Sequence, residues 1–549
     1  MSTHCVERWW IIALAFFLAR VTCFSLNSSQ KSPFLTQLRR THGRHPVNAL
    51  QQDHTIYGLG TCIPKGGCGI AVVRISGPDS LRVLKLLTTK DDISLHLNKW
   101  TPREAKLCTL YSVVDKSTID NAITIYFPSP NSYTGDDVVE IHTHGSKGVI
   151  SELFSNLIHI SKSHNLKIRQ AEKGEFTRRA FYSGKLDLTQ VEGLRDLIAS
   201  DSHYKKRDAF LKYSGSLGTI YKEWTNTLIG ILARLEARID FDEDSANDLN
   251  LPEYESELIK KELTILLGNI NKRLNDKRGE IIDRGIKLIL LGSPNAGKSS
   301  FMNTLCSRDV SIVSDVPGTT RDIIETNYNC NEFQFKVLDT AGIRIISQSL
   351  PNDHDLIEKI GIKKTLDKLN ESNVIIFFFD PSRADESKHA LKIFREHLDF
   401  TPIIIVCISK EDLISREQLE LCINDIRMEL KTLSFKSNVC LLPVCNLERE
   451  SVEKVLDEVY STIHNSLKDN NSVDLDMDPV INNERHKSHL NSIVYSINST
   501  LSMLNKGEVN LEIISEYLRE CINQLEFIVG KRTNEDVLDS IFKTFCIGK

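Results

Sequence analysis

A glycine-rich phosphate-binding loop is the clearest chemical signal in this sequence. Residues 292–299 read Gly-Ser-Pro-Asn-Ala-Gly-Lys-Ser, follow a strand-like apolar run and precede a helix-like segment, which is the context that the G-x-x-x-x-G-K-[ST] motif requires. Its glycines let backbone N–H groups approach phosphate oxygens, and the start of the following helix adds positive potential. We expect Lys298 to neutralise the β- and γ-phosphates and the Ser299 hydroxyl to ligate Mg²⁺.

Two further motifs supply the remaining groups around a magnesium-bound nucleotide. Residues 339–342 read Asp-Thr-Ala-Gly and end a strand-like run, so Asp339 is expected to reach Mg²⁺ directly or through water, and the Gly342 amide to sense a γ-phosphate. Residues 317–322 contain Thr320, whose hydroxyl is expected to complete the Mg²⁺ coordination when the third phosphate is present. The motifs therefore predict a nucleoside triphosphate site.

Residues 409–412, which read Ser-Lys-Glu-Asp and end another strand-like run, predict the base. The stem of Lys410 is expected to cover a purine, and the Asp412 carboxylate can accept two N–H donors that guanine has and adenine lacks. GTP is therefore the predicted nucleotide. GTPases usually carry Asn where this chain has Ser409, and residues 443–446 (Pro-Val-Cys-Asn) stand where a Ser-Ala pair is usual, so we expect weaker guanine binding.

The group that orients the attacking water does not follow from spacing. Many Ras-like enzymes use a Gln directly after the Asp-x-x-Gly glycine, but this chain has Ile343, which cannot orient water. Asp355 and Glu358 lie in the segment expected to move with the γ-phosphate, and spacing does not choose between them. Each is alternatively an ordinary solvated helix charge.

The composition is that of a multidomain globular protein. The chain has 549 residues, 41% hydrophobic and 26% charged, which excludes a wholly disordered, collagen-like or coiled-coil protein. A formal net charge of −5 gives no overall nucleic-acid signature, so any RNA contact must be local. The basic runs 178–179 and 205–207 are candidates, although charge runs are usually solvated faces. The 13 cysteines form no Cys-x-x-Cys pair, which indicates neither a zinc ribbon nor a disulfide scaffold.

Hydrophobic periodicity predicts the elements that position these motifs. In the mixed region 55–185, strands are expected over 69–75 and 122–127 and a helix over 149–161. Apolar residues at three- and four-residue steps predict long helices over 217–239 and 258–274. Buried-type strands alternating with helices are expected over 286–291, 335–339, 374–380 and 403–409. The simplest architecture is an α/β domain inserted into a helical domain and preceded by an α+β domain.

The first 52 residues differ in composition from the rest. Residues 9–19 form an apolar run that is too short to span a bilayer as a helix, and residues 26–52 contain basic residues but no acidic one. A signal-like segment followed by a transit-like segment is typical of a leader for a secondary (apicoplast-type) plastid. A mitochondrial presequence or a membrane anchor is the alternative.

Four further segments carry a family resemblance. They are Gly69–Pro78 (GIAVVRISGP), Phe127–Glu140 (FPSPNSYTGDDVVE), Gly174–Leu188 (GEFTRRAFYSGKLDL) and the terminal Phe545–Lys549 (FCIGK). Together with the GTPase motifs, they make residues 55–549 resemble the MnmE (TrmE) family of tRNA modification GTPases, of the TrmE-Era-EngA-like class. The resemblance implies a multidomain α/β and α+β fold with an inserted Ras-like P-loop GTPase domain. The implied divisions are 1–52 (leader), 53–184 (tetrahydrofolate-binding and dimerisation domain), 185–284 (first segment of the helical domain), 285–466 (G domain) and 467–549 (second segment of the helical domain).

The resemblance also implies roles for single residues. The implied folate contacts are Arg74, Glu140, Lys185 and Lys549; cations suit the glutamate tail of a folate, and a carboxylate suits the N–H donors of its pterin. The implied K⁺ ligands are Asn295, Ser314, Val316 and Thr319, with K⁺ acting in place of an arginine finger. The implied catalytic residues are the water-orienting Glu358, Lys298, Thr320 and the terminal Cys546. Ser183 and Lys173 depart from the Asn and Pro that the family usually has.

The complete predicted set of GTP-contacting residues is Asn295, Ala296, Gly297, Lys298, Ser299, Ser300, Ser314, Thr319, Thr320, Asp339, Thr340, Ala341, Gly342, Ser409, Lys410 and Asp412. By resemblance, K⁺-stimulated and Mg²⁺-dependent GTP hydrolysis drives modification at carbon 5 of the wobble uridine (position 34) of tRNA. The implied partners are tRNA, a 5-formyl- or 5,10-methylene-type tetrahydrofolate, and an MnmG (GidA)-type FAD protein that forms a heterotetramer with a homodimer of this chain. No stable membrane association is expected after leader removal. The alternatives are a regulatory GTPase of ribosome assembly and a folate-binding protein with a decayed GTPase.

Overall fold

The computed structural model contains two compact units, which are described separately. The first comprises Met1–Leu186 and Phe542–Lys549, and the second comprises Asp187–Ile541. The structure describes residues 53–90, 100–241, 252–276, 278–279, 281, 285–293, 295–306, 324–330, 333–339, 372–396, 403–433, 439–469, 478–506 and 510–548. The leader predicted for residues 1–52 lies outside them.

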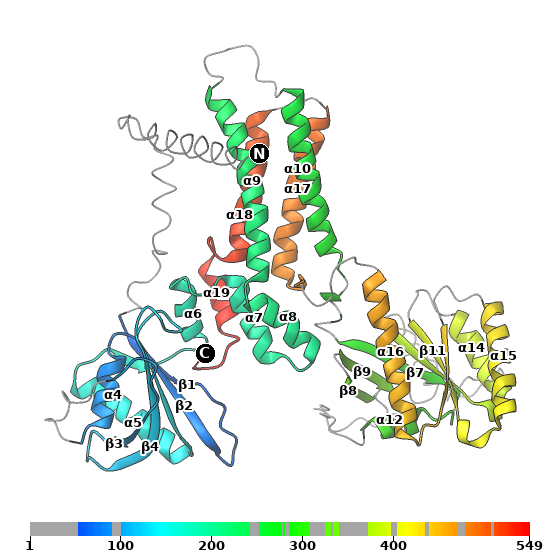
Figure 1. The fold of residues 1–549 in the computed structure, drawn as a ribbon, viewed down its shortest axis with the longest axis horizontal. Helices are drawn as coiled ribbons and strands as arrows, with labels where there is room; N and C mark the ends of the chain where they lie inside the picture. The colour runs from blue at the N-terminus through cyan, green and yellow to red at the C-terminus, as the bar shows by residue number, and fades with distance from the viewer. Residues whose placement is uncertain are drawn as a thin grey trace, which may run out of the picture. The chain divides into compact units, whose positions relative to one another are not determined.

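A six-stranded sheet forms the centre of the first unit (Figure 1). Its order is β3-β4-β5-β2-β1-β6, and every pairing is antiparallel except that of β1 with β6. The strands are β1 (Thr55–Leu59), β2 (Cys68–Ser76), β3 (Lys106–Tyr111), β4 (Thr118–Phe127), β5 (Val138–Gly145) and β6 (Ile168–Gln170). The strands predicted over 69–75 and 122–127 are therefore confirmed as parts of β2 and β4.

The two faces of this sheet have different roles. Helices α4 (Ser80–Thr88) and α5 (Lys147–Ser163) pack on the side chains of one face, which include the buried Val73 and Ile75 of β2. Because side chains alternate along a strand, Arg74 points to the other face. On that face α6 (Glu175–Tyr182) packs Phe176 against Ile56 of β1.

Helices from two separate sequence segments share one core in the second unit. They are α9 (Ser216–Phe241), α10 (Glu253–Leu274), α17 (Glu484–Lys506) and α18 (Leu511–Val529). The other helices outside the α/β region are α7 (Leu188–Ala199), α8 (His203–Tyr213) and α19 (Glu535–Phe542). The apolar stripe predicted over 217–239 is largely buried on α9, although Ile220 and Ile239 are only partly buried. The same helix also buries Tyr221 fully. Its ring packs edge-to-face on Trp224, with ring centroids 5.6 Å apart.

A second six-stranded sheet occupies the segment between α10 and α17. Its order is β12-β11-β10-β7-β9-β8, parallel except for β8 beside β9. The strands are β7 (Ile286–Gly292), β8 (Ile324–Cys330), β9 (Phe333–Asp339), β10 (Val374–Phe379), β11 (Ile403–Ser409) and β12 (Val439–Val444). The helices and 3-10 turns are α12 (Lys298–Cys306), η3 (Pro381–Arg383), α14 (Ala384–Glu396), η4 (Glu411–Leu413), α15 (Arg416–Leu433) and α16 (Arg449–Asp469).

Both faces of the second sheet are buried, as is typical of parallel sheets. Leu288 and Leu290 of β7 join the core on the α12 and α16 side, and Ile289 and Leu291 join the core on the α14 and α15 side (Figure 1). The predicted strand over 374–380 ends one residue early, because Asp380 accepts a hydrogen bond from the N–H of Ser382 and so begins η3.

The mixed α/β and α+β fold class is confirmed by these two sheets and the helical core. The carboxyl ends of β7, β10, β11 and β12 meet at one edge of the second sheet, where α/β proteins bind ligands. Within the part of the chain that the structure describes, no helix combines the length and the apolar character needed to cross a bilayer.

Candidate functional sites

The loop between β7 and α12 has the backbone of a phosphate cradle. Gly292, Asn295 and Gly297 have φ angles of 143°, 63° and 96°. A Cβ atom on Gly292 would lie 2.5 Å from the Phe378 carbonyl oxygen, and one on Gly297 would lie 2.1 Å from Nδ2 of Asn446. Both positive φ angles favour glycine, and at Gly292 the close approach of the Phe378 backbone also requires it.

Lys298 is buried at the start of α12, where its ammonium group lies inside the loop. Its Nζ donates hydrogen bonds to the carbonyl oxygens of Gly292 at 2.9 Å and Ser293 at 2.8 Å. Ser299 is exposed on the first turn of the same helix, and Ala296, within the loop, is buried. A cation, an exposed hydroxyl and a helix N-terminus on one loop fit a magnesium-bound polyphosphate.

The end of β11 presents the residues predicted to bind the base. Ser409 is fully buried, and its Oγ donates to the Phe379 carbonyl oxygen at 3.1 Å. Lys410 has a φ of 60°, and its Nζ lies 2.6 Å from Oδ2 of Asp380. Burial raises the pKa of Asp380, but hydrogen bonds from Lys410 and Ser382 outweigh burial and hold it below its usual value. Asp412 is exposed in η4.

The loop after β12 lies directly against the phosphate cradle. Asn446 is 6% exposed, and its Nδ2 donates to the Gly297 carbonyl oxygen at 3.1 Å. The Thr304 hydroxyl of α12 donates to the Asn446 carbonyl oxygen at 2.8 Å, and the Cys445 N–H donates to the Ser451 Oγ at 2.9 Å. Residues 443–446 marked this place in the sequence, but the contact of the Asn446 side chain was not predicted.

Several predicted residues lie outside the described part of the chain. They are Ser314, Val316, Thr319, Thr320, Thr340, Ala341, Gly342, Glu358 and Lys549, together with the side chain of Asp339. Of the predicted K⁺ ligands, Asn295 is described and is exposed on the loop. The structure thus brings together the phosphate loop and the base loop of the predicted site.

In the first unit, two of the predicted folate residues form an ion pair. Arg74 and Glu140 are register partners on β2 and β5, and Nη2 and Nε of Arg74 donate to Oε1 of Glu140 at 2.7 and 3.0 Å. The Arg74 guanidinium also lies 5.4 Å from the ring centroid of Tyr133 and 5.8 Å from that of Phe176. Arg74 is therefore held by charge and by two aromatic faces.

The terminal segment lies at the same ion pair, although it is far away in the sequence. Nη1 of Arg74 donates to the Gly548 carbonyl oxygen at 3.3 Å. Gly548 has a φ of 97°, and a Cβ on it would lie 2.2 Å from the Leu59 carbonyl oxygen. Ile547 forms an antiparallel bridge with Lys173, and the exposed Cys546 accepts a hydrogen bond from the Gly174 N–H at 3.4 Å through its carbonyl oxygen. The backbone thus brings residues 546–548 to the predicted folate residues.

The residues that depart from the usual family pattern have structural places. Lys173 supplies the backbone bridge to the terminal segment. Ser183 is the C-cap residue of α6, and its N–H bonds the Arg179 carbonyl oxygen at 2.9 Å. Lys185, the third predicted folate residue, is exposed just beyond that helix.

The two basic runs do not form simple charged patches. Arg179 is 4% exposed and lies 3.3 Å from Glu175 and 3.4 Å from Asp136, so its guanidinium is buried in an ion-pair network. Lys205 pairs with Asp201 at 2.9 Å, and Lys206 is exposed. Neither run offers all of its charges to an RNA.

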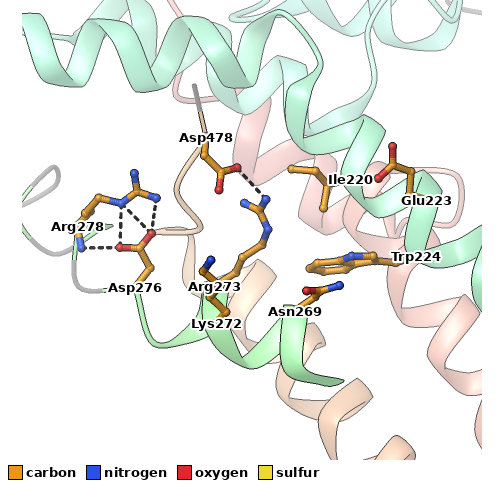
Figure 2. Close-up of a pocket in the computed structure, with 9 residues that line it drawn as sticks. All are labelled: Ile220, Glu223, Trp224, Asn269, Lys272, Arg273, Asp276, Arg278 and Asp478. Carbon is orange, nitrogen blue, oxygen red and sulfur yellow. Dashed lines mark hydrogen bonds and ion pairs between the residues drawn. The ribbon is translucent and has the colours of Figure 1, made fainter. Parts of the chain in front are cut away.

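A cavity of about 240 Å³ in the second unit is lined by none of the residues predicted to bind GTP, a metal ion or folate. Figure 2 shows its lining, with the ion pairs Arg273–Asp478 (2.7 Å) and Arg278–Asp276 (2.6 Å) on one side and Trp224 on the other. These pairs lie beside the chain segments that leave α10 and enter α17. The residues around the cavity are Ile220, Glu223, Trp224, Asn269, Lys272, Arg273, Asp276, Arg278 and Asp478.

Comparison with known proteins gives matches along most of the chain. A family model described as "GTP-binding protein TrmE N-terminus" matches residues 55–185, and one described as "MnmE helical domain" matches residues 188–546. The protein named tRNA modification GTPase MnmE of Rickettsia bellii is 37% identical over 491 residues, which cover 88% of this chain and 98% of that protein. Its namesake in Rickettsia typhi is 36% identical over 488 residues, with the same coverage of 88% and 98%.

Solved structures match a smaller part of the chain. Aquifex aeolicus Era bound to GDP.AlF4- is 25% identical, covers 38% of this chain and 66% of that chain, and has a TM-score of 0.26. The G domain of the T. maritima FeoB iron transporter is 18% identical, covers 32% of this chain and 98% of that chain, and has a TM-score of 0.24. With TM-scores this low, neither likeness supports a conclusion about this chain.

Proposed function

Because this chain belongs to the MnmE family of tRNA modification GTPases, we propose that it hydrolyses GTP to drive modification at carbon 5 of the wobble uridine of tRNA. The observation that carries the GTPase is the cradle of Gly292 and Gly297 around the Lys298 ammonium group, beside the base loop of Lys410 and Asp412. Backbone N–H groups of such a loop bind phosphate oxygens, and Lys298 offsets the charge that develops during phosphoryl transfer.

Ser299, Thr320 and Asp339 are the residues that would hold Mg²⁺, which supplies charge neutralisation when bound. Glu358 is the proposed water-orienting residue. Asn295, Ser314, Val316 and Thr319 are the proposed K⁺ ligands. The exposed Asn295 side chain, on a loop with left-handed φ, is the described feature that supports a cation there.

Potassium dependence tests this part of the proposal. Replacing K⁺ by Na⁺ at constant ionic strength is expected to reduce GTP turnover sharply, and equal rates in the two salts would contradict the K⁺ role.

Glu358→Ala is expected to retain GTP binding and to lose most of the hydrolysis. Asp355→Ala is its matched control, since spacing alone does not separate the two acids.

The proposed folate site is centred on Arg74 and Glu140, with Lys185, Lys549 and Cys546 completing it. Three observations support it: the 2.7 Å ion pair, the two aromatic rings beside the guanidinium, and the terminal segment that reaches Arg74 through Gly548. Charged and aromatic groups on one sheet face fit a flat heterocycle with a carboxylate tail. A 5-formyl- or 5,10-methylene-type tetrahydrofolate is the proposed ligand.

The proposed assembly is a homodimer that forms a heterotetramer with an MnmG-type FAD protein. The sheet face that carries Arg74 supports self-association, because it also exposes Leu107 (72%) and Ile123 (44%), which are register partners on β3 and β4. Exposed apolar side chains that lie together on one sheet face are typical of protein interfaces. Sedimentation of wild type and Leu107→Glu tests the dimer; an unchanged dimer in the variant would place the interface elsewhere.

The proposal also includes a domain division and a plastid-directed leader over residues 1–52. The domains are the N-terminal domain (53–184), the two segments of the helical domain (185–284 and 467–549) and the G domain (285–466). The composition of residues 26–52 is the support for the leader. Fusing residues 1–52 to a fluorescent protein tests the destination. A mitochondrial signal would reassign the organelle.

Mass spectrometry of organellar tRNA, with and without this protein, tests the main conclusion. We expect a substituent on carbon 5 of the wobble uridine that disappears when the protein is depleted. A wobble uridine that is unmodified in the presence of the protein would show that the tRNA assignment is wrong.

A further inference from the structure

The loop after β12 makes a side-chain contact with the phosphate cradle. Nδ2 of Asn446 donates to the Gly297 carbonyl oxygen at 3.1 Å, although 149 positions separate the two residues. The Thr304 hydroxyl fixes the backbone of the same loop by donating to the Asn446 carbonyl oxygen at 2.8 Å. Asn446 is thus held against both the cradle and the helix that begins at Lys298.

The end of β11, where GTPases usually carry an asparagine, has a different side chain with a different partner. The hydroxyl of Ser409 is short, and it donates within the sheet to the Phe379 carbonyl oxygen at 3.1 Å. Its side chain is fully buried at that position. The amide that is missing from β11 is therefore present one strand further along the sheet, since β12 is the neighbour of β11.

We propose that Asn446 is a positioning residue for the nucleotide site, and that it replaces the amide lacking at Ser409 by holding the loop after β12 in register with the phosphate cradle. This inference rests on the proposed GTP binding. Asn446 acts through the backbone of Gly297, whose neighbours face the phosphates. Gly297 has no side chain of its own, and a Cβ there would displace the Asn446 amide from its hydrogen bond.

The second half of the Asn446 amide argues against a purely structural role. Its Oδ1 is buried and has no hydrogen-bond partner among the described residues. An asparagine selected only for stability would pair both halves of its amide, because a buried unpaired acceptor is unfavourable. Removing the side chain therefore loses one hydrogen bond and also removes one unpaired acceptor, and the two effects oppose each other in the nucleotide-free protein.

The test separates nucleotide affinity from folding stability. In Asn446→Ala, we expect the Kd for fluorescent GDP to rise roughly tenfold, the value for one lost hydrogen bond that orders a binding loop. The melting temperature of the nucleotide-free protein is expected to stay within about 2 °C of wild type. Asn446→Asp keeps the shape but puts a buried carboxylate against the Gly297 carbonyl oxygen, so it is expected to weaken GDP binding at least as much and also to lower the melting temperature. Glu450→Ala, exposed at the start of α16, is the matched control and is expected to change neither value.

A compensating variant tests whether an amide at the end of β11 can replace the amide of Asn446 after β12. Ser409→Asn added to Asn446→Ala is expected to recover at least half of the lost affinity on a logarithmic scale. An unchanged Kd in both Asn446 variants would overturn the inference. So would an affinity loss in Asn446→Ala that is matched by a fall in its melting temperature, or a double variant with wild-type stability and no recovery.

The outcome for wild type distinguishes this inference from the proposed function. If the wild-type chain binds GDP and the Asn446 variants bind it equally well, then only the positioning role fails. If the wild-type chain binds neither GDP nor GTP, the proposed function fails as well.

Discussion

The phosphate cradle and the Arg74–Glu140 site are built in opposite ways. The cradle comes from one continuous stretch between β7 and α12, and backbone conformation at Gly292 and Gly297 shapes it. The Arg74 site is assembled from β2, β5 and a terminal segment in which Gly548 is 474 positions from Arg74. The first is a local property of the chain, and the second exists only after the sheet and the terminal segment have come together.

This difference has a consequence for how each site tolerates change. A cradle made of backbone is sensitive at its glycines and at its single ammonium group. An assembled site is sensitive wherever one of its separate segments is attached. Variants in the two regions should therefore fail in different measurements, and their failures should be independent, because sites that share no partner residue are usually additive.

Lys298→Ala should have the largest effect. Loss of the ammonium group that lies inside the cradle is expected to reduce GTP turnover by roughly 10²–10³-fold, since electrostatic stabilisation of phosphoryl transfer is lost. Folate binding by the same variant should equal that of wild type. Turnover is measured by phosphate release, with Lys431→Ala on the exposed surface of α15 as the control. Turnover within threefold of wild type would mean that another cation serves the cradle.

Arg74→Ala should have the next largest effect, on the other site. Binding of 5-formyltetrahydrofolate is expected to weaken by roughly 10- to 100-fold, because charged hydrogen bonds are lost and Glu140 is left without its partner. GTP turnover without tRNA should not change. Isothermal titration is the measurement, and Arg82→Ala, exposed on α4, is the control. Equal folate affinity in Arg74→Ala and wild type would show that the Arg74–Glu140 ion pair is not part of the folate-binding site.

Gly548→Ala sharpens the comparison, because it disturbs only the contact between the terminal segment and β1. A Cβ there would lie 2.2 Å from the Leu59 carbonyl oxygen at a φ of 97°. We expect folate affinity to fall roughly threefold to tenfold and unfolding of the first unit to become easier by about 1–2 kcal/mol. Gly184→Ala is the control for the cost of a positive φ without a steric clash, because φ there is 67° and no atom lies within 4 Å of a Cβ. Identical folate affinities in the two variants would show that the terminal segment does not support the site.

A third region, with buried charge but no proposed ligand, gives the smallest effect. Glu192 lies 2.8 Å from His486 and 3.0 Å from Arg485 in the helical core. Burial raises the pKa of Glu192, but these two partners outweigh burial and lower it to about 2. Burial also lowers the pKa of His486, against the attraction of Glu192, so its ring holds a proton less readily in the folded chain than in the unfolded chain.

Both shifts have the same sign for stability. The unfolded chain takes up a proton at His486 below about pH 6.5, and at Glu192 below about pH 4.5, before the folded chain does. Stability should thus be complete above pH 6.5 and should fall by at most about 2 kcal/mol by pH 5. Urea unfolding followed by Trp fluorescence measures it. A free energy of unfolding at pH 5 that equals or exceeds the value at pH 7 would contradict the predicted direction of the pH dependence.

The same contrast explains what could be predicted from the sequence. The cradle and the strands β7, β9, β10 and β11 could be predicted, because a phosphate-loop motif and an apolar run such as Ile286–Gly292 depend on residues that are close in the sequence. Strands β8 and β12 of the same sheet were not predicted. Arg74 and Glu140 look like ordinary charges in the sequence, and only a family resemblance singled them out. The register that pairs them depends on the whole sheet. Asn446 was missed for a related reason, since its value lies in a contact with a loop 149 positions away.

The inserted sheet also has a thermodynamic role for the helical core. Helices α10 and α17 belong to that core, but Leu274 and Glu484 are separated by about 200 residues of intervening chain. If that chain were unfolded, joining the two helices would cost about 5 kcal/mol in loop-closure entropy, since the cost grows as (3/2)RT ln n. A folded insert is a much shorter effective loop. Any nucleotide that stabilises the insert therefore also lowers the entropic cost of holding the helices together.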